Sequence, residues 1–472
     1  MNLKSSYLII LLILVIIYNS SFSLFISIPF KIIIIYNDIN YNSTSFLYEN
    51  FKKEIILELN IGTPPQKIYS KINQDSACFL FKKNAININN NKYFPNNSSS
   101  FSQNDVLKSF DPYKSAIDIF HFQQINKKNK VNFLLENYTN LTNDSYTPII
   151  GLNIPLILLG NVCPNFIMDL KNVNIINKLE WSLIYNDKYD GEFIIGDELY
   201  EYNPNKYNKT KYSTLYMNSQ YKINFDSVYI QDKQSNNNLV EVKFNITETH
   251  ININSGFIIG TSEYKDYIEQ NFFNKLINKK ICRKDLITYY AQNDNNFNDI
   301  DKKMYNKNFY VYSCETLQFL GKTNPRIPST NYYNEFPNLI FSSKMLEYNF
   351  EFSNSDLFKE ILFKYYFLII FKDDKNTKEN EKEIWHLGEP FYKKYTFSIN
   401  LDAKTIGFYI DKEINNNNKN NINNTNTNII DEKNKNNINQ RSDNEKNYDI
   451  IKYLIEIPIY HFISHLTNLI LY

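Results

Sequence analysis

The chain has little glycine, tryptophan, histidine or cysteine, with 10, 2, 5 and 4 of these residues among 472. It contains no glycine-rich phosphate-binding loop and no dinucleotide fingerprint. Neither sign of charge is in excess, because 51 basic residues stand against 50 acidic ones. The lack of a glycine-rich loop indicates no nucleotide cofactor, and the balanced charge indicates no nucleic-acid partner.

The histidines are too scattered to predict a metal site. Only His461 and His465 are four residues apart, and they lie in the C-terminal tail, where an exposed or membrane-facing role is favoured over zinc binding. The other three are His121, His250 and His386. We therefore expect neither a metal nor any other cofactor.

Aromatic residues are abundant, with 38 Tyr and 35 Phe. Such residues favour strands and argue against a wholly disordered chain. The length suits two or three domains, or one two-lobed fold with extensions.

The N-terminus is typical of a secretory signal. Residues 1–23 contain Lys4, an apolar core over Tyr7–Tyr18 and a small polar end, and this core is too short to span a bilayer. A cleaved signal peptide is predicted, with an uncleaved anchor as the alternative. Entry into the secretory pathway would make N-glycosylation available to the chain's nine Asn-x-Ser/Thr sequons, at Asn42, Asn96, Asn97, Asn137, Asn140, Asn143, Asn208, Asn245 and Asn423.

The two ends of the remaining chain differ in composition. The β-prone run Leu24–Tyr36 predicts an N-terminal strand or a short pro-segment within residues 24–49. Residues 412–448 are rich in Asn and Lys and are expected to be a disordered linker. Residues 449–472 have the length of a membrane span but carry Lys452 and Glu456, so a spanning helix, a peripheral segment and a removed anchor signal all stay open.

Motifs in the first half of the chain follow a recognisable order. Asn60–Phe81 reads NIGTPPQKIYSKINQDSACFLF, Lys92–Phe101 reads KYFPNNSSSF, and Pro148–Leu152 reads PIIGL. This order resembles that of the pepsin-like aspartic proteases. In that family, a GTPPQ-type turn is followed seven residues after its Gln by the first catalytic Asp, which here falls on Asn73.

Further motifs extend the resemblance to the second half. Ile251–Thr261 (ININSGFIIGT) is similar to the family's second active-site loop, and Trp385–Phe391 (WHLGEPF) is similar to its Trp-x-Leu-Gly-Asp-x-Phe element. The resemblance covers about residues 50–411. It implies an all-β, two-lobed fold with few short helices, with lobes at residues 50–205 and 206–411 and a peptide cleft between them.

Both catalytic positions are changed in this alignment. Asn73 and Asn254 stand at the two Asp positions, and Asp75 is the nearest carboxylate that could substitute for them. The resemblance also implies supporting roles for other loop residues: Ser76, Ser255, Gly256, Gly151 and Gly388. The family's flap carries a Tyr at its tip, and Tyr113 is the best candidate here, although no Tyr-Gly pair is present.

Four cysteines in an oxidising compartment allow two disulfides. Cys282 and Cys314 lie 32 residues apart and are the favoured pair, and the resemblance supports this because many family members have a second-lobe disulfide at similar spacing. Cys78 and Cys163 could pair or stay free.

The sequence thus predicts a secreted, vesicular or surface-exposed pepsin-like homologue that lacks the catalytic dyad. We expect a monomer that binds extended polypeptide without cleaving it, with membrane association through the tail as an option. An active endopeptidase and a surface structural protein with a degenerate cleft are the alternatives.

Overall fold

The computed structural model describes residues 25–34, 53–74, 76–83, 92–103, 113–123, 125–136, 145–153, 163–186, 189–207, 214–216, 221–233, 239–244, 248–291, 305–315, 335–361, 364–373 and 384–409. All of them belong to one unit of the chain, residues 1–415. They are mostly strands with a few short helices, so the predicted all-β class is confirmed at this level.

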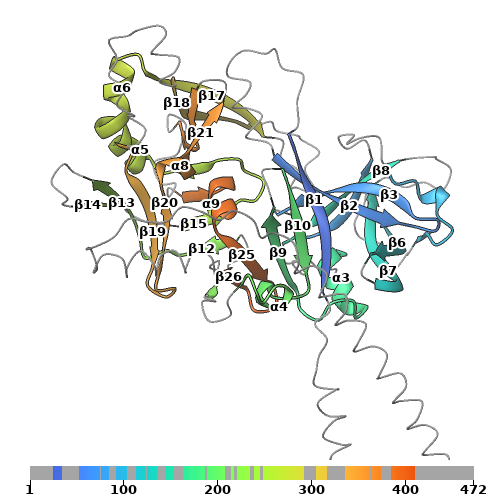
Figure 1. Ribbon diagram of the computed structural model, residues 1–472. Coiled ribbons are helices and arrows are strands. Elements are labelled where there is room, and N and C mark those ends of the chain that lie inside the picture. Colours follow the sequence, from blue (N-terminus) through green and yellow to red (C-terminus); the bar gives the residue numbers. More distant parts are fainter. Residues whose placement is uncertain are drawn as a thin grey trace, which may run out of the picture. The chain divides into compact units, whose positions relative to one another are not determined.

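The largest sheet in this part of the chain has thirteen strands (Figure 1). Near its centre, β1 (Ile26–Ile34) lies between β2 (Lys53–Ile61) and β10 (Asp190–Ile195). β2 also pairs with β6, so the sheet closes partly on itself. The other strands are β3 (Gln66–Asn73), β4 (Phe79–Lys83), β5 (Ser102–Gln103), β6 (Tyr113–Phe122), β7 (Ile125–Glu136), β8 (Tyr146–Gly151), β9 (Glu180–Tyr185), β11 (Thr214–Tyr216), β25 (Thr396–Asn400) and β26 (Thr405–Tyr409).

Two smaller sheets are built from the second half of the chain. The nine-stranded sheet contains β12 (Lys222–Ile223), β15 (Glu248–Ile251), β16 (Ile258–Gly260), β17 (Cys282–Ala291), β18 (Tyr305–Glu315), β21 (Phe358–Ile361), β22 (Lys364–Phe367), β23 (Ile369–Lys372) and β24 (Ile384–Leu387). The four-stranded sheet contains β13 (Ser227–Lys233), β14 (Leu239–Phe244), β19 (Asn338–Ser343) and β20 (Tyr348–Phe352).

One predicted strand is interrupted. The sequence predicts a strand over Tyr221–Ile230, whereas β12 ends at Ile223 and β13 begins at Ser227. β12 pairs in the nine-stranded sheet and β13 in the four-stranded one. The chain therefore has to change sheets within the segment, which its alternating pattern does not reveal.

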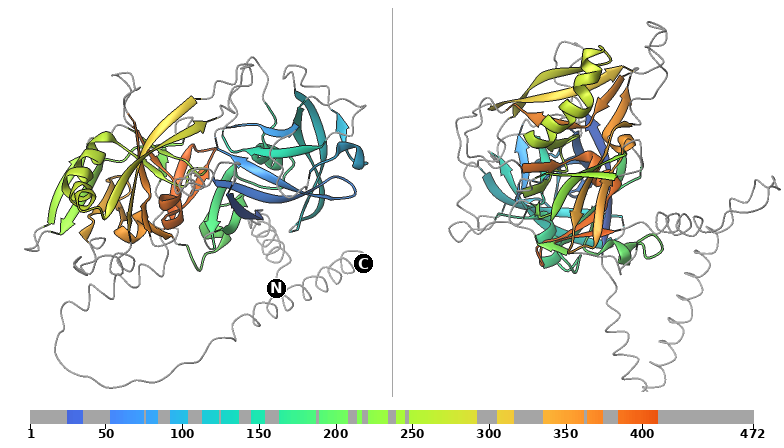
Figure 2. Two further views of the ribbon diagram at one scale, coloured as in Figure 1. Left: turned by 90° about the horizontal axis from the view of Figure 1, so that it is seen from above. Right: turned by 90° about the vertical axis from the view of Figure 1, so that its left-hand side faces the viewer.

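Apolar residues recur at close to helical spacing over Ser262–Asn278, which predicts a helix, and the structure confirms it. α5 (Ser262–Ile268), the π-helical turn η3 (Glu269–Phe273) and α6 (Asn274–Asn278) follow one another without a break (Figure 2). The Thr261 side chain caps the helix by accepting from the N–H of Tyr264. The other short helices are η1 (Pro95–Asn97), α3 (Phe166–Asn172), α4 (Leu199–Tyr202), α8 (Asn354–Leu357) and α9 (Glu389–Lys394).

Aromatic side chains fill the core. Trp181 and Trp385 are fully buried, and Phe79 contacts Phe81 and Phe166 edge-on with ring centroids 5.2 and 5.1 Å apart. Such pairs add to the free energy gained by burying the rings. The aromatic-rich composition is therefore used to pack the sheets.

Two disulfides reinforce the sheets. Cys282 and Cys314 are direct partners on β17 and β18 and form the predicted bond. Cys78 pairs with Cys163 across a separation of 85 residues, which resolves the question that the sequence leaves open.

The predicted terminal segments, residues 1–23 and 412–472, lie outside the described residues. Within the described part, no helix has both the length and the hydrophobicity needed to cross a membrane.

Candidate functional site

The first candidate loop joins β3 to β4 and begins at Asn73, the last residue of β3. β3 pairs in parallel with β8, where Asn73 lies beside Gly151. The N–H of Leu152 donates to the carbonyl of Asn73 at 3.0 Å, and the N–H of Asn153 donates to the carbonyl of Ser76 at 2.9 Å. The loop is thus pinned to the end of β8 at two points.

The second candidate loop joins β15 to β16 and is also held by the end of a later strand. β15 pairs in parallel with β24, with Ile251 beside Leu387. The N–H of Asn252 donates to the carbonyl of Leu387 at 2.9 Å, and the N–H of Glu389 donates to the carbonyl of Ser255 at 2.9 Å. Each loop therefore follows a strand that is paired in parallel with a strand from much later in the chain.

Two serines identify the corresponding residues of the loops. The N–H of Cys78 donates to the hydroxyl of Ser76 at 3.2 Å, and the N–H of Phe257 donates to the hydroxyl of Ser255 at 3.2 Å. Each serine hydroxyl also reaches the carbonyl two residues ahead. The two serines hold their loops through corresponding partner atoms, with hydroxyl-to-carbonyl distances of 3.5 Å for Ser76 and 2.7 Å for Ser255, so Ser76 corresponds to Ser255.

Two glycines give the same correspondence. A Cβ on Gly151 would lie 2.6 Å from the backbone N and O of Cys78, and a Cβ on Gly388 would lie 2.0 Å from the backbone O of Phe257. Both positions need glycine because a neighbouring backbone passes too close for any side chain.

The correspondence revises the prediction for the second loop. Three residues before Ser76 stands Asn73, and three residues before Ser255 stands Asn252, so the counterpart of Asn73 is Asn252 and not the predicted Asn254. Asn254 instead donates its N–H to the side-chain oxygen of Asn252 at 3.1 Å. The equal three-residue spacing to a serine was the sequence signal that could have found Asn252.

Asn254 corresponds by chain position to Asp75, which lies outside the described residues. The Asn254 side chain is half-buried, and its Oδ1 is enclosed without a hydrogen-bond partner within the described part of the chain. A buried acceptor in this state costs about 1–3 kcal/mol, which makes Asn254 an energetically expensive residue of the second loop.

Gln74 joins the two loops directly. Its side chain is buried, donates from Nε2 to the carbonyl of Ile251 at 2.5 Å and accepts at Oε1 from the N–H of Ile253 at 2.8 Å. The two bonds go to the residues on either side of Asn252. Gln74 itself directly follows Asn73, so its side chain holds the two loops together beside both Asn residues. Sequence reasoning missed Gln74, because nothing in its local pattern indicates a partner 177 residues away.

Buried tyrosines support the loops. The hydroxyl of Tyr392, on α9, donates to the carbonyl of Ile253 at 3.0 Å, and that of Tyr221 donates to the carbonyl of Leu152 at 2.6 Å. Burial raises the pKa of the Tyr392 phenol well above its ordinary value, so it stays a neutral donor. The backbone of the second loop is thus held by a tyrosine that does not change charge.

The hairpin of β6 and β7 occupies the chain segment where the flap is expected. Its turn lies between Phe122 and Ile125, whereas Tyr113 pairs with Glu136 at the opposite, open end. Tyr113 therefore cannot be the tip residue of this hairpin. Of the turn residues, Gln123 is exposed.

Asp118 on β6 fixes the KYFPNNSSSF turn. Its carboxylate is fully buried and accepts from the hydroxyls of Tyr93 at 2.5 Å, Ser98 at 3.1 Å and Ser100 at 2.6 Å. Gln66 holds the same turn by exchanging two hydrogen bonds with the backbone of Phe94, both at 2.9 Å. Asp118 thus joins the KYFPNNSSSF turn to the β6–β7 hairpin, and Gln66 joins the same turn to the first motif, Asn60–Phe81.

His250 and His386 are cross-strand neighbours on β15 and β24, with ring centroids 5.2 Å apart. No group of three or more His, Cys, Asp or Glu residues within the described ranges could hold a metal ion.

Comparison with models of known protein families finds no match, and comparison with curated proteins finds no significant match.

Proposed function

We propose that the chain is a pepsin-like aspartic protease homologue that has two lobes and lacks the catalytic dyad, and that it binds extended polypeptide without hydrolysing it. The observation that carries this proposal is the matched pair of loops. Asn73 and Asn252 each stand three residues before a serine that accepts from the N–H two residues ahead, and Gln74 connects the loops that carry them.

The residues present argue against hydrolysis. Aspartic proteolysis uses two carboxylates about 3 Å apart that share a proton, one of which accepts a proton from the attacking water. Asn has the shape of Asp but no basic anionic form at any working pH. Ile251–Phe257 contains no carboxylate, and the carboxylate of Glu389 beside it is paired with Lys393 at 2.7 Å.

The same residues favour binding. Each Asn side chain has two donors and one acceptor oxygen, which suit the N–H and C=O groups of an extended backbone. The loops are also fixed before any ligand arrives, because serines, glycines and Gln74 hold them. Preorganisation of this kind lowers the entropic cost of binding.

One observation favours the structural alternative. The β6–β7 hairpin has no Tyr at its turn, so a flap of the family's kind would lack the residue that covers the substrate. A surface protein with a degenerate cleft would need no such residue.

The test is incubation of the secreted protein with denatured protein and with a library of unstructured peptides between pH 3.5 and 7. We expect retention of peptides without new cleavage products. Cleavage that a statine-type inhibitor abolishes would establish the active endopeptidase, with Asp75 as the first residue to substitute. Absence of both binding and cleavage would leave the structural role.

A further inference from the structure

Among the described residues, the four-stranded sheet has one covered edge and one open edge. The covered edge is β20, where the hydroxyl of Tyr395 donates to the carbonyl of Glu351 at 2.6 Å and the Tyr395 ring packs edge-on against Phe350, with ring centroids 4.9 Å apart. The open edge is β14, the outermost strand of this sheet in Figure 1. In the part of the chain that the structure describes, the backbone of β14 makes hydrogen bonds only to β13.

The strand at the open edge is held in place by its other neighbours. β14 pairs with β13 along all six of its residues. Phe244, at its end, is buried and packs edge-on against Tyr264 and Tyr267 of α5, with ring centroids 5.4 and 5.9 Å apart. The outer edge of β14 is therefore a fixed row of backbone N–H and C=O groups, which is the template that a further strand needs.

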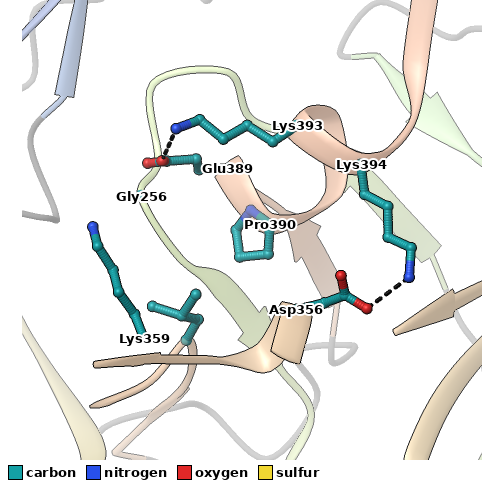
Figure 3. A pocket seen from close by; sticks show the side chains of 8 residues that line it. Gly256, Asp356, Lys359, Glu389, Pro390, Lys393 and Lys394 are labelled. Atoms are coloured by element: carbon teal, nitrogen blue, oxygen red, sulfur yellow. Dashed lines mark hydrogen bonds and ion pairs between the residues drawn. The ribbon is translucent and has the colours of Figure 1, made fainter. Parts of the chain in front are cut away.

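Two opposite charges stand on the outer face of β14. Glu241 and Lys243 are exposed, and because side chains alternate along a strand they lie together on the face opposite to Phe244. Neither makes an ion pair with any residue that the structure describes. By contrast, Lys394 is paired with Asp356 at 2.6 Å (Figure 3). Both charges of β14 are thus available to a partner.

A second copy of β14 would satisfy both charges at once. When two copies pair antiparallel about a two-fold axis at Val242, Glu241 of each copy faces Lys243 of the other on one face of the sheet. Opposite charges at directly facing positions stabilise a strand pair, and like charges destabilise it. An axis at Glu241 or at Lys243 would instead place two like charges opposite each other. The charges therefore select one register of the antiparallel pair.

The same lysine discriminates against other strands. A lysine on an edge strand ordinarily opposes pairing, because its charge is not matched on the incoming strand. Lys243 is matched by a strand that has an acidic residue at the facing position, and β14 itself carries that residue as Glu241. An edge that excludes most strands thus admits its own copy.

We propose that the protein forms a two-fold symmetric dimer through antiparallel pairing of β14 with its copy, which joins two four-stranded sheets into one. The paired edge has six residues per copy, against about 20–30 residues per side in a standard interface, so the dimer should be weak and reversible. The monomer expected from the sequence would persist at low concentration. β14 belongs to neither candidate loop, so the dimer does not depend on the proposed function.

The dimer is tested by sedimentation velocity at protein concentrations from about 1 μM to about 1 mM. Wild type should show a monomer–dimer equilibrium. Glu241→Lys and Lys243→Glu each place like charges opposite each other, so each variant alone should dimerise about tenfold more weakly or not at all. An equimolar mixture of the two variants should form a heterodimer, because every facing pair of charges is then of opposite sign.

Two controls separate this pairing from a general effect of charge. The double variant Glu241→Lys with Lys243→Glu keeps the facing charges opposite and should dimerise like wild type. Lys344→Glu and Glu347→Lys make the same charge changes at exposed positions outside β14, and each should also dimerise like wild type. Wild type that stays monomeric at about 1 mM would leave the edge to a different strand and overturn the proposal. Single β14 variants that dimerise like wild type, or a mixture that forms no heterodimer, would overturn it as well.

Discussion

The side chains of Asn73 and Asn252 have the outline of aspartate but none of its acid–base chemistry. An amide cannot take a proton from water, whereas it can both donate and accept in a fixed hydrogen-bond network. At the residue scale the candidate site is therefore suited to holding polar groups and unsuited to activating them.

Gln74→Ala should be the most damaging single polar truncation in the two loops. It removes two buried hydrogen bonds and leaves the backbone of Ile251 and Ile253 without these partners, so we expect a loss of about 2–4 kcal/mol in the free energy of unfolding. Urea unfolding measures this loss. Gln66→Ala is the matched control, because Gln66 also makes two backbone bonds but at an exposed position, and it should cost less than about 1 kcal/mol. Equal losses in the two variants would contradict the bridging role of Gln74.

Glu180 should make the fold more stable in mild acid. Its carboxylate is fully buried and accepts from Ser398 Oγ at 2.7 Å and Asn400 Nδ2 at 3.1 Å, and burial raises its pKa to about 7. The folded state therefore binds this proton more tightly than the unfolded state. The contribution is absent above pH 7 and grows as the pH falls towards 4.5, to about 3 kcal/mol at most.

Glu180→Gln isolates this effect. The amide resembles the protonated acid, and the Ser398 hydroxyl can accept from it. We expect the variant to match wild type near pH 4.5 and to exceed it near pH 7.5, with a flatter profile in urea unfolding between these values. A wild-type profile that is already flat, or a variant with the same slope, would rule out Glu180 as the titrating group.

At the scale of elements, the sequence correctly predicts the helices and strands that a local pattern of residues determines. The helix over Ser262–Asn278 follows from its apolar spacing, and the strands within Leu179–Asp197 follow from turn residues between apolar runs. The alignment of the second loop failed because two Asn residues, Asn252 and Asn254, both fit the pattern. The spacing to a serine distinguishes them, because Asn252, like Asn73, stands three residues before a serine whose hydroxyl accepts from the N–H two residues ahead. That the two serines have the same role becomes visible only in the folded loops.

Each loop passes close to the end of a later strand, the first loop at Gly151 and the second at Gly388. We therefore predict that neither glycine can be replaced. In Gly151→Ala and Gly388→Ala the new methyl group would lie 2.6 and 2.0 Å from backbone atoms, which can only move with the loop. We expect each variant to lose at least about 3 kcal/mol in urea unfolding, or to fail to fold. Ser76→Ala and Ser255→Ala in the same loops should each cost about 1 kcal/mol, and a similar loss from glycine and serine variants would refute the close crossing.

At the scale of the whole molecule, distant parts of the chain complete one another's structure. β25 pairs with β9, and the side chain of Lys171 contacts Asp402 at 2.8 Å, a separation of 231 residues. The loops show the same organisation, since each depends on a strand from much later in the chain, where Asn73 lies beside Gly151 and Ile251 beside Leu387. The position of each loop is therefore fixed by pairing between distant strands and not by the loop's own sequence alone.

The correspondence of Asn73 with Asn252 can be tested by introducing two carboxylates. If the proposed function is right, Asn73→Asp with Asn252→Asp places both acids at matched positions, so we expect weak hydrolysis of denatured protein near pH 4 that a statine-type inhibitor blocks. Positioned acid–base groups contribute about 10²–10⁴-fold each, which leaves activity detectable even without a Tyr at the hairpin turn. The matched control, Asn73→Asp with Asn254→Asp, carries the same charge but places the second acid two residues away, and it should stay inactive. Activity in the control and none in the matched pair would return the second position to Asn254 and refute the correspondence drawn from the serines and glycines.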